Sequence, residues 1–258
     1  MAEIILIGTS SGKASLNHFH SSFIILTPSY NLLIDAGDGI SKALLAQQIS
    51  YDEIDGILFS HLHPDHYTGL AALIVQMKMI ERKKTLDIFI HSDLVNVIRN
   101  FLIQSYLFPD RMGFEIKYNR FKDNVKFKIS DDISFITRQN SHLDSVSKLD
   151  DYKSQSFSSS SFLLNVDDIN VHYTSDVGEK KDLLLFSDKI VDFLISEVTH
   201  ISLEDIITAA DKSNLEGQII LTHINDEDII SLQKFILELP ASLEKKIIIA
   251  SDGLKIKL

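Results

Sequence analysis

The segment His61-Leu62-His63-Pro64-Asp65-His66 decides the fold of this chain. It places four side chains able to coordinate a metal within six residues, directly after the apolar run 56–59, which reads as a buried strand. If the segment is extended, its first two histidines point to one side, whereas Asp65 and His66 belong to the turn that opens the next helix. The segment can therefore present ligands to two neighbouring metal centres. The alternative, a solvated histidine-rich loop, is disfavoured by this density of ligands.

The composition restricts which metals such a site takes. The chain has 258 residues and contains no cysteine, which excludes disulfides, thiolate zinc fingers, iron–sulfur clusters and cysteine nucleophiles. Any metal must then bind to nitrogen and oxygen. Imidazole and carboxylate ligands suit zinc, manganese or iron.

Charge and hydropathy indicate the class of partner. The formal net charge is −11 at pH 7, which argues against a broad basic surface and disfavours long nucleic acids as partners. The first apolar run is short and lacks a basic leader, and no window approaches the length of about 20 apolar residues that spans a membrane. We therefore expect a cytoplasmic protein without a membrane segment.

Strand-like and helix-like patterns alternate along the chain, which predicts stacked sheets between helical layers. Helical spacing predicts helices over 65–83 and 93–107, among others. We expect one domain over 1–258. The segment 141–161 is the irregular stretch, rich in Ser, Asp and Lys, and is typical of a functional loop, a lid or a disordered insertion.

The histidine segment resembles the H-x-H-x-D-H signature of the metallo-β-lactamase superfamily, and the resemblance covers almost the whole chain. It implies an α/β fold, a four-layer αββα sandwich of two mixed β-sheets flanked by helices. Further positions match the superfamily pattern: Asp35 in LLIDAGDG, His142 in RQNSHLDS, Asp176 in HYTSDVG and His223 in IILTHIND. The resemblance implies that Asp35 has a mainly structural role beside the site.

The resemblance also implies how the ligands divide between two metals. His61, His63 and His142 would hold one metal, and Asp65, His66 and His223 the other, with Asp176 between them. The implied cofactors are two divalent transition-metal ions, Zn²⁺ first, with Mn²⁺ and Fe²⁺ as alternatives.

Assigning a lone histidine as a ligand is the weakest step, because most single histidines are ordinary surface or core residues. His91 and His172 compete with His142 for this position. His91 lies at the start of a helix and His172 inside the strand that leads to Asp176, so neither enters the ligand set. His18 and His20 precede a strand and are interpreted as surface residues.

Within the superfamily, LIGTSSG, LISEVTH and ASDG are similar to segments of the ribonuclease Z branch and its small phosphodiesterase relatives. They favour phosphodiester chemistry over lactam or thioester cleavage. Two departures argue against tRNA processing. Ser196 stands where the branch carries a proton-donating histidine, and no Gly/Pro-rich basic arm is visible. The resemblance therefore implies a small phosphodiester or a short RNA as substrate.

The predicted mechanism is hydrolysis by a hydroxide that bridges two metals. Asp65 and Asp176 would orient it, and Glu197 would orient a ligand imidazole, although a strand-end salt bridge explains Glu197 equally well. His200 is the hypothetical proton donor that replaces the missing histidine, against the simpler interpretation of a helix-start or surface residue.

Three other functions stay open at this point. A lactonase or thioesterase would use the same metal site with a different pocket. A non-catalytic metal-binding interaction protein is disfavoured by the complete ligand set, and an iron redox protein by the absence of residues for a flavin domain. Homodimerisation is implied by the resemblance alone.

Overall fold

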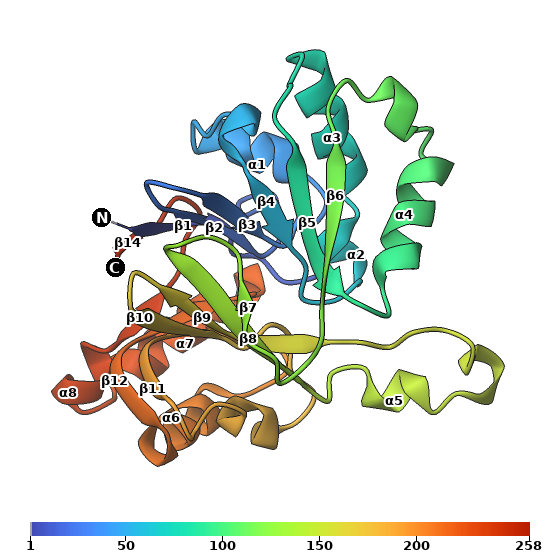
Figure 1. Cartoon of the computed structure of the whole chain (residues 1–258). Coiled ribbons are helices and arrows are strands. Elements are labelled where there is room, and N and C mark those ends of the chain that lie inside the picture. Colours follow the sequence, from blue (N-terminus) through green and yellow to red (C-terminus); the bar gives the residue numbers. More distant parts are fainter. Residues whose placement is uncertain (1) are drawn as a thin grey trace.

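Two seven-stranded sheets face each other in the computed structural model, which describes residues 2–258. Helices cover the outer face of each sheet, so the layers run helix, sheet, sheet, helix (Figure 1). Both sheets contain parallel and antiparallel pairs. The predicted four-layer sandwich of two mixed sheets is therefore confirmed.

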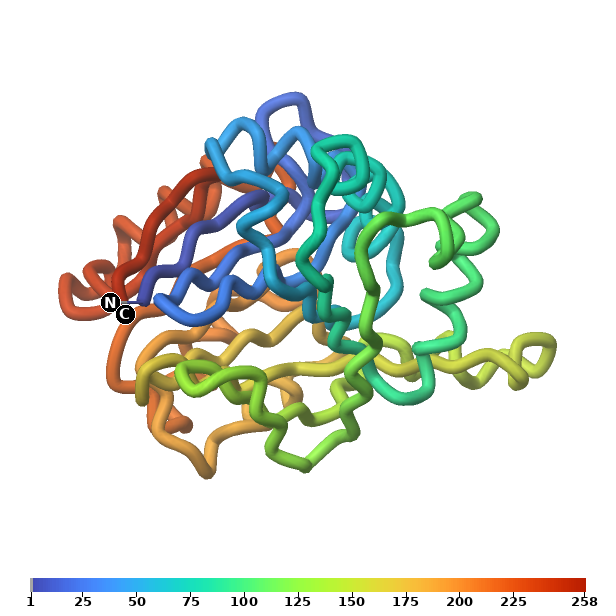
Figure 2. Tube along the Cα trace, turned by 45° about the horizontal axis from the view of Figure 1, so that its top comes forward, coloured from blue at the N-terminus to red at the C-terminus, as the bar shows by residue number. Residues whose placement is uncertain are grey.

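The first sheet has the order β14-β1-β2-β3-β4-β5-β6. Its strands are β1 (Glu3–Gly8), β2 (Ser22–Leu26), β3 (Asn31–Ile34), β4 (Gly56–Leu58), β5 (Leu86–His91), β6 (Ile116–Phe121) and β14 (Lys255–Lys257). From β14 to β3 the pairs are antiparallel, and from β3 to β6 they are parallel. Because β14 pairs with β1, the two ends of the chain lie side by side (Figure 2).

The second sheet repeats this plan with the order β13-β12-β11-β10-β9-β8-β7. Its strands are β7 (Phe127–Lys128), β8 (Ile133–Gln139), β9 (Ser160–Val166), β10 (Ile169–Tyr173), β11 (Ile190–Glu197), β12 (Asn214–Thr222) and β13 (Ile247–Ile249). From β7 to β10 the pairs are antiparallel, and from β10 to β13 they are parallel.

Side-chain alternation along the strands separates the core into layers. In β1, Ile5 and Ile7 pack with the helices of the first half, whereas Ile4 and Leu6 point into the core between the sheets. The α-helices are α1 (Ile40–Ala46), α2 (Pro64–Tyr67), α3 (Leu70–Met79), α4 (Val95–Gln104), α5 (Asp144–Ser147), α6 (Leu203–Lys212), α7 (Ile229–Leu237) and α8 (Ala241–Glu244). None of the helices in residues 2–258 is long and apolar enough to cross a membrane.

The helix predicted over 65–83 is wrong in one respect, because the structure divides it into α2 and α3. The chain passes so close to Gly37 that a Cβ on Gly69 would lie 2.0 Å from the Gly37 carbonyl oxygen. A side chain at position 69 therefore has no room, and this close approach requires glycine. The break separates the turn that carries Asp65 and His66 from the longer helix that packs on the sheet.

The segment 141–161, predicted to be irregular, forms an arm that contains α5 and a short 3₁₀ turn, η3 (Asp150–Tyr152). In both ribbon views the arm extends away from the body of the molecule (Figures 1 and 2). Its last two residues, Ser160 and Ser161, already belong to β9 and are buried. The base of the arm carries His142, so the arm begins at the candidate site.

Candidate metal centre

The seven side chains predicted as metal ligands come together between the two sheets, because they follow strands whose carboxyl ends meet at the same edge. They form two groups, within each of which one ligand atom per residue lies within 4.8 Å of the others. The groups are His61, His63, His142 and Asp176, and Asp65, His66, Asp176 and His223. Asp176 belongs to both, as the resemblance implies. Metal binding by these residues stays a prediction.

The first group combines a buried histidine with two partly exposed ones. His61 is fully buried, and its Nδ1 lies 3.0 Å from the Ser60 hydroxyl. His63 and His142 come from opposite halves of the chain, and their Nδ1 and Nε2 atoms are 3.0 Å apart. Asp176 faces this group with Oδ2, which lies 3.6 Å from the Nε2 atom of His142.

The second group is more buried and more tightly connected. Its central residue is His66, whose Nε2 lies 3.4 Å from one oxygen of Asp65 and 3.4 Å from Oδ1 of Asp176. His223 brings its Nε2 to 3.2 Å from the same oxygen of Asp65. His223 has a positive φ of 55°, a sparsely populated conformation for a non-glycine residue, which indicates a functional constraint at this strand end.

Asp35, at the end of β3, is the buried residue that holds the second group in place. One of its oxygens accepts hydrogen bonds from the Ser60 hydroxyl at 2.7 Å, His66 Nδ1 at 2.9 Å and the Tyr173 hydroxyl at 3.1 Å. The other oxygen accepts the Ser60 amide at 2.8 Å. Asp35 therefore fixes the His66 ring so that Nε2 points at the ligand group, as an outer carboxylate does for a metal-bound histidine.

Burial and neighbouring charge divide the histidines into two classes. Burial lowers the pKa of His61 and His63, and lowers that of His142 to about 4. These three rings are therefore neutral near pH 7. Burial also lowers the pKa of His66, but Asp176 and Asp35 outweigh it and raise the pKa well above its usual value. Burial raises the pKa of Asp176, yet the surrounding histidines bring it well below its usual range.

Two buried nitrogen atoms indicate that these residues fit metal ions. The Nε2 atoms of His61 and His66 are buried without a hydrogen-bond partner, which costs about 1–3 kcal/mol for a polar atom. Both face Asp176, at 3.9 Å and 3.4 Å. Once each Nε2 is deprotonated, a cation beside it would satisfy it, and neutral imidazoles with ionised carboxylates suit divalent transition metals.

Glu197, predicted either to orient a ligand imidazole or to form a strand-end salt bridge, contacts His200 in the loop that follows β11. Its carboxylate accepts hydrogen bonds from the Thr199 and His200 amides, at 2.6 and 2.8 Å, and lies 3.2 Å from Nδ1 of His200. It therefore orients His200 and no predicted ligand. The hydrogen bond to Glu197 raises the pKa of His200. The His200 ring is 40% exposed, with its centroid 5.0 Å from that of His142 and 5.8 Å from that of His223.

Several supporting residues were not found by sequence reasoning. Thr199 is one, since its hydroxyl donates to the His223 carbonyl and lies 3.3 Å from Nδ1 of that ring. Ser60 and Tyr173, which both bind Asp35, are others. Ser60 directly precedes the histidine segment, but nothing in the sequence indicates that the hydroxyl of Tyr173 reaches Asp35 across 138 positions.

The remaining histidines lie outside both ligand groups, as predicted. His91 contacts Asp93 and Asp123. The others belong to separate surroundings: His18 beside Asp252, His20 against the Ser11 carbonyl, and His172 buried beside Phe186.

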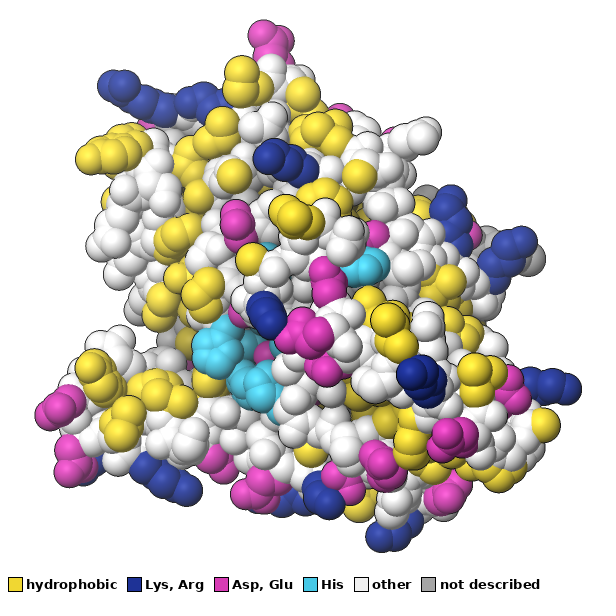
Figure 3. Space-filling model, turned by 180° about the vertical axis from the view of Figure 1, so that it is seen from behind, with side chains coloured by type: hydrophobic (Ala, Val, Ile, Leu, Met, Phe, Trp, Pro, Cys, Tyr) yellow, Lys and Arg dark blue, Asp and Glu magenta, His cyan; other side chains and the backbone are white. Residues whose placement is uncertain are grey.

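The ligand groups open into a hollow of about 310 Å³ at the surface. Figure 3 shows the histidine cluster in this hollow, with basic and acidic side chains along its rim. An adjoining hollow of about 470 Å³ shares Thr199 and His200 with the first and is lined by apolar side chains that include Leu232 and Phe235. The two hollows offer space for a reacting group and for the rest of a small substrate.

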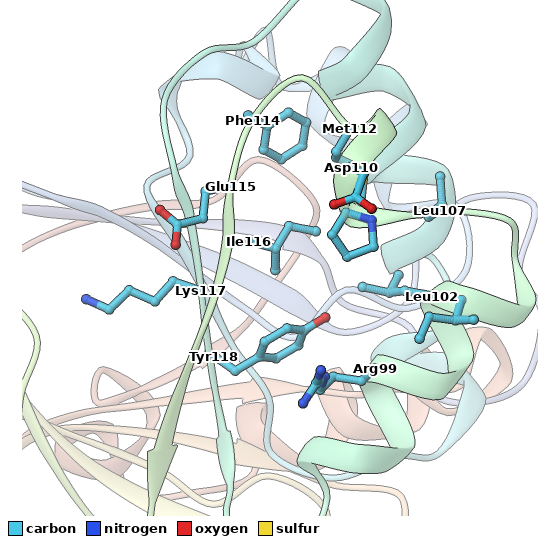
Figure 4. A pocket seen from close by; sticks show the side chains of 12 residues that line it. Arg99, Leu102, Leu107, Asp110, Met112, Phe114, Glu115, Ile116, Lys117 and Tyr118 are labelled. Carbon is cyan, nitrogen blue, oxygen red and sulfur yellow. The ribbon is translucent and has the colours of Figure 1, made fainter.

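A larger cavity of about 640 Å³ lies elsewhere, between α4 and the edge strand β6. Arg99, Leu102, Phe114 and Tyr118 are among the side chains that face it (Figure 4). None of the predicted ligands lines this cavity. Although it is larger than the hollow at the ligand groups, this cavity therefore contains none of the groups predicted for metal-dependent chemistry.

Comparison with known proteins agrees with this fold. The metallo-β-lactamase fold protein YhfI from Bacillus subtilis superposes with a TM-score of 0.76 at 17% identity, over 99% of this chain and 98% of that one. A ribonuclease Z of Saccharolobus islandicus is 28% identical over 131 residues, which are 51% of this chain and 40% of the relative. The chain thus matches less than half the length of this curated relative. The chain therefore has the metallo-β-lactamase fold, and about half of it is similar in sequence to ribonuclease Z.

A match to a protein-family model assigns the chain to a particular family. The model described as Anti-Pycsar protein Apyc1 matches residues 2–234. The chain therefore belongs to this family. The Anti-Pycsar protein Apyc1 of Bacillus phage BSP38 is 33% identical over 93 residues, which cover 36% of each chain.

Proposed function

We propose that this protein is a metal-dependent phosphodiesterase that hydrolyses a small phosphodiester or a short RNA at a two-metal centre. The observation that carries the proposal is the pair of ligand groups that share Asp176, with the unpartnered Nε2 atoms of His61 and His66 directed at it. The name of one relative, ribonuclease Z, supports a substrate from nucleotide chemistry.

The seven predicted ligands would hold two divalent cations, Zn²⁺ first and Mn²⁺ or Fe²⁺ as alternatives. When bound, two such ions supply Lewis acidity and a nucleophile at neutral pH. The protein supplies the framework. Asp35 and Thr199 fix the rings of His66 and His223, and Asp65 and Asp176 provide the negative charge that balances the cations.

His200 is proposed as the proton donor to the leaving group. Glu197 holds its Nδ1 side, which leaves Nε2 of the ring available to a substrate in the shared wall of the two hollows. The raised pKa keeps the ring protonated closer to neutral pH, as a general acid requires. Glu197 is then a positioning residue.

A small substrate is supported by the shape and charge around the site. The reactive hollow is about 310 Å³. The arm beside it, residues 141–159, carries two lysines and three aspartates, and 2 − 3 gives −1. Such an arm lacks the positive charge needed to hold a polynucleotide backbone.

The test is a substrate panel with metal-loaded protein. Bis(4-nitrophenyl) phosphate, cyclic and linear dinucleotides, nucleoside cyclic monophosphates, short RNAs, lactones, thioesters and precursor tRNA should be compared at equal protein concentration. We expect turnover of small phosphodiesters and little processing of precursor tRNA. A preference for lactones or thioesters, or efficient salt-sensitive cleavage of precursor tRNA, would contradict the proposal.

A further inference from the structure

The loop between β1 and β2 lines the reactive hollow and connects the two halves of the molecule. Ile224 donates its amide to the Thr9 carbonyl at 2.9 Å, and the Ser11 hydroxyl donates to Asn225 at 2.6 Å. The Ser15 hydroxyl contacts the carboxylate of Asp226 at 2.8 Å. These bonds hold the loop against the segment that follows β12.

At the centre of this loop the backbone approaches the predicted ligand Asp65. A Cβ placed on Gly12 would lie 3.0 Å from the Asp65 Oδ2 atom. The next residue, Lys13, therefore projects from a backbone that is fixed beside the ligand groups. Among the residues of the described chain 2–258 that line the hollow, Lys13 is the one lysine or arginine.

The present partner of Lys13 is Glu227, which lies in the acidic 3₁₀ turn η5 (Asp226–Asp228). The side chains of this ion pair are 63% and 55% exposed. Exposed pairs of this kind contribute little to stability, so the pair is easily exchanged. Asp226 and Asp228, by contrast, accept hydrogen bonds from Ser15 and Asn225.

We propose that Lys13 recruits the substrate phosphate by exchanging Glu227 for a non-bridging phosphate oxygen. The inference rests on the proposed phosphodiesterase function and adds a selection rule, namely that the site favours anionic diesters over neutral esters. Without Lys13, an incoming phosphate meets the carboxylates of η5 with no nearby ammonium to offset them. Glu227 holds the Lys13 ammonium group at the rim of the hollow and competes with the substrate phosphate for it.

The experiment compares metal-loaded variants for hydrolysis of bis(4-nitrophenyl) phosphate and for binding of inorganic phosphate by calorimetry. Lys13→Met should raise KM and the phosphate Kd about tenfold, as expected for the loss of a charge-assisted hydrogen bond. Lys13→Arg should restore most of the affinity. Glu227→Gln should lower both constants, because the competing carboxylate is gone.

The matched control is Lys128→Met, which removes an exposed lysine from a pair with Asp131 in the turn beyond β7, with side chains 67% and 92% exposed. KM should also rise with salt in the wild type and less steeply in Lys13→Met.

The outcomes separate the two proposals. If the wild type cleaves the diester and Lys13→Met matches Lys128→Met in KM and phosphate Kd, the role of Lys13 is refuted. The same holds if Glu227→Gln weakens binding as much as Lys13→Met, because the pair would then be a structural clamp. If no phosphodiester is cleaved, the proposed function fails, and phosphate binding still decides whether Lys13 selects the anion.

Discussion

The two ligand groups that share Asp176 differ in how the protein supports them. In the second group, Asp35 fixes His66 and Thr199 contacts His223, so both rings are oriented before any metal binds. In the first group, His63 and His142 contact each other at 3.0 Å. A metal between these two rings has to separate them. The comparison suggests that one centre is preformed by its surroundings and that the other is completed by the metal itself.

The largest expected effect comes from His66→Ala, which removes the central ligand of the preformed group. Metal content should fall from about two ions per chain to about one, and phosphodiester hydrolysis should drop to background, because both ions are needed for the reaction. Metal analysis, circular dichroism and turnover measure this. His91→Ala is the control, since it removes an imidazole outside both groups. Full metal content with unchanged turnover in His66→Ala would refute the ligand assignment.

His200→Ala tests whether the imidazole between the two ligand groups, beside His142 and His223, donates a proton to the leaving group. Loss of a general acid should slow an alkyl or nucleoside leaving group by about 10²- to 10⁴-fold, and a nitrophenyl leaving group far less. Metal content should stay constant. If neither substrate is slowed, His200 is a bystander, and water or a residue of the arm is the proton donor. Equal slowing of both substrates would mean that His200 acts in another way than by donating a proton to the leaving group.

Asp35→Asn tests whether the preformed group depends on its outer carboxylate. Metal affinity at the His66 centre should fall about 10- to 100-fold, the usual effect of losing such a partner. The His63 centre should change little. Tyr173→Phe is the milder comparison, because it removes one donor to Asp35 and leaves the carboxylate on His66. Equal weakening of both centres in Asp35→Asn would mean that Asp35 supports the fold as a whole.

The smallest predicted effect is a difference between the two centres in the number of protons released when a metal binds. The raised pKa of His66 means that this ring carries an extra proton near pH 7, and Nε2 must lose it to bind a metal. Affinity at this centre should therefore rise about tenfold per pH unit until the pH passes that pKa. The lowered pKa values of His61, His63 and His142 predict no such rise at the other centre between pH 6 and 8.

Calorimetry in two buffers of different ionisation enthalpy measures this release. His63→Ala isolates the second centre and His66→Ala isolates the first. Equal proton release in the two variants would contradict the distinction between the groups.

The parts of the site that the sequence predicts are those that a local pattern contains. The histidine segment is contiguous, and Asp176 and His223 each follow an apolar strand, so their place at a sheet edge follows from periodicity. The two-sheet architecture follows from the alternation of strands and helices together with the superfamily resemblance.

The parts that escaped prediction depend on contacts between distant residues. The break between α2 and α3 lies at Gly69, which touches Gly37, and no propensity within 65–83 indicates that contact. The contact of Glu197 with His200, in place of a ligand, depends on how the chain turns after β11. Likewise, the pairing of Lys13 with Glu227 joins residues 214 positions apart.

The pairing of β1 with β14 has a consequence for synthesis of the chain. The first sheet gains β14 only when residues 255–257 have been made, long after its partner strand β1. The histidine segment appears early and His223 late, so a nascent chain exposes part of a metal site that it cannot yet complete. Contacts of such long sequence separation fold slowly. A nascent chain therefore has a long interval in which a metal ion can bind to an incomplete ligand set.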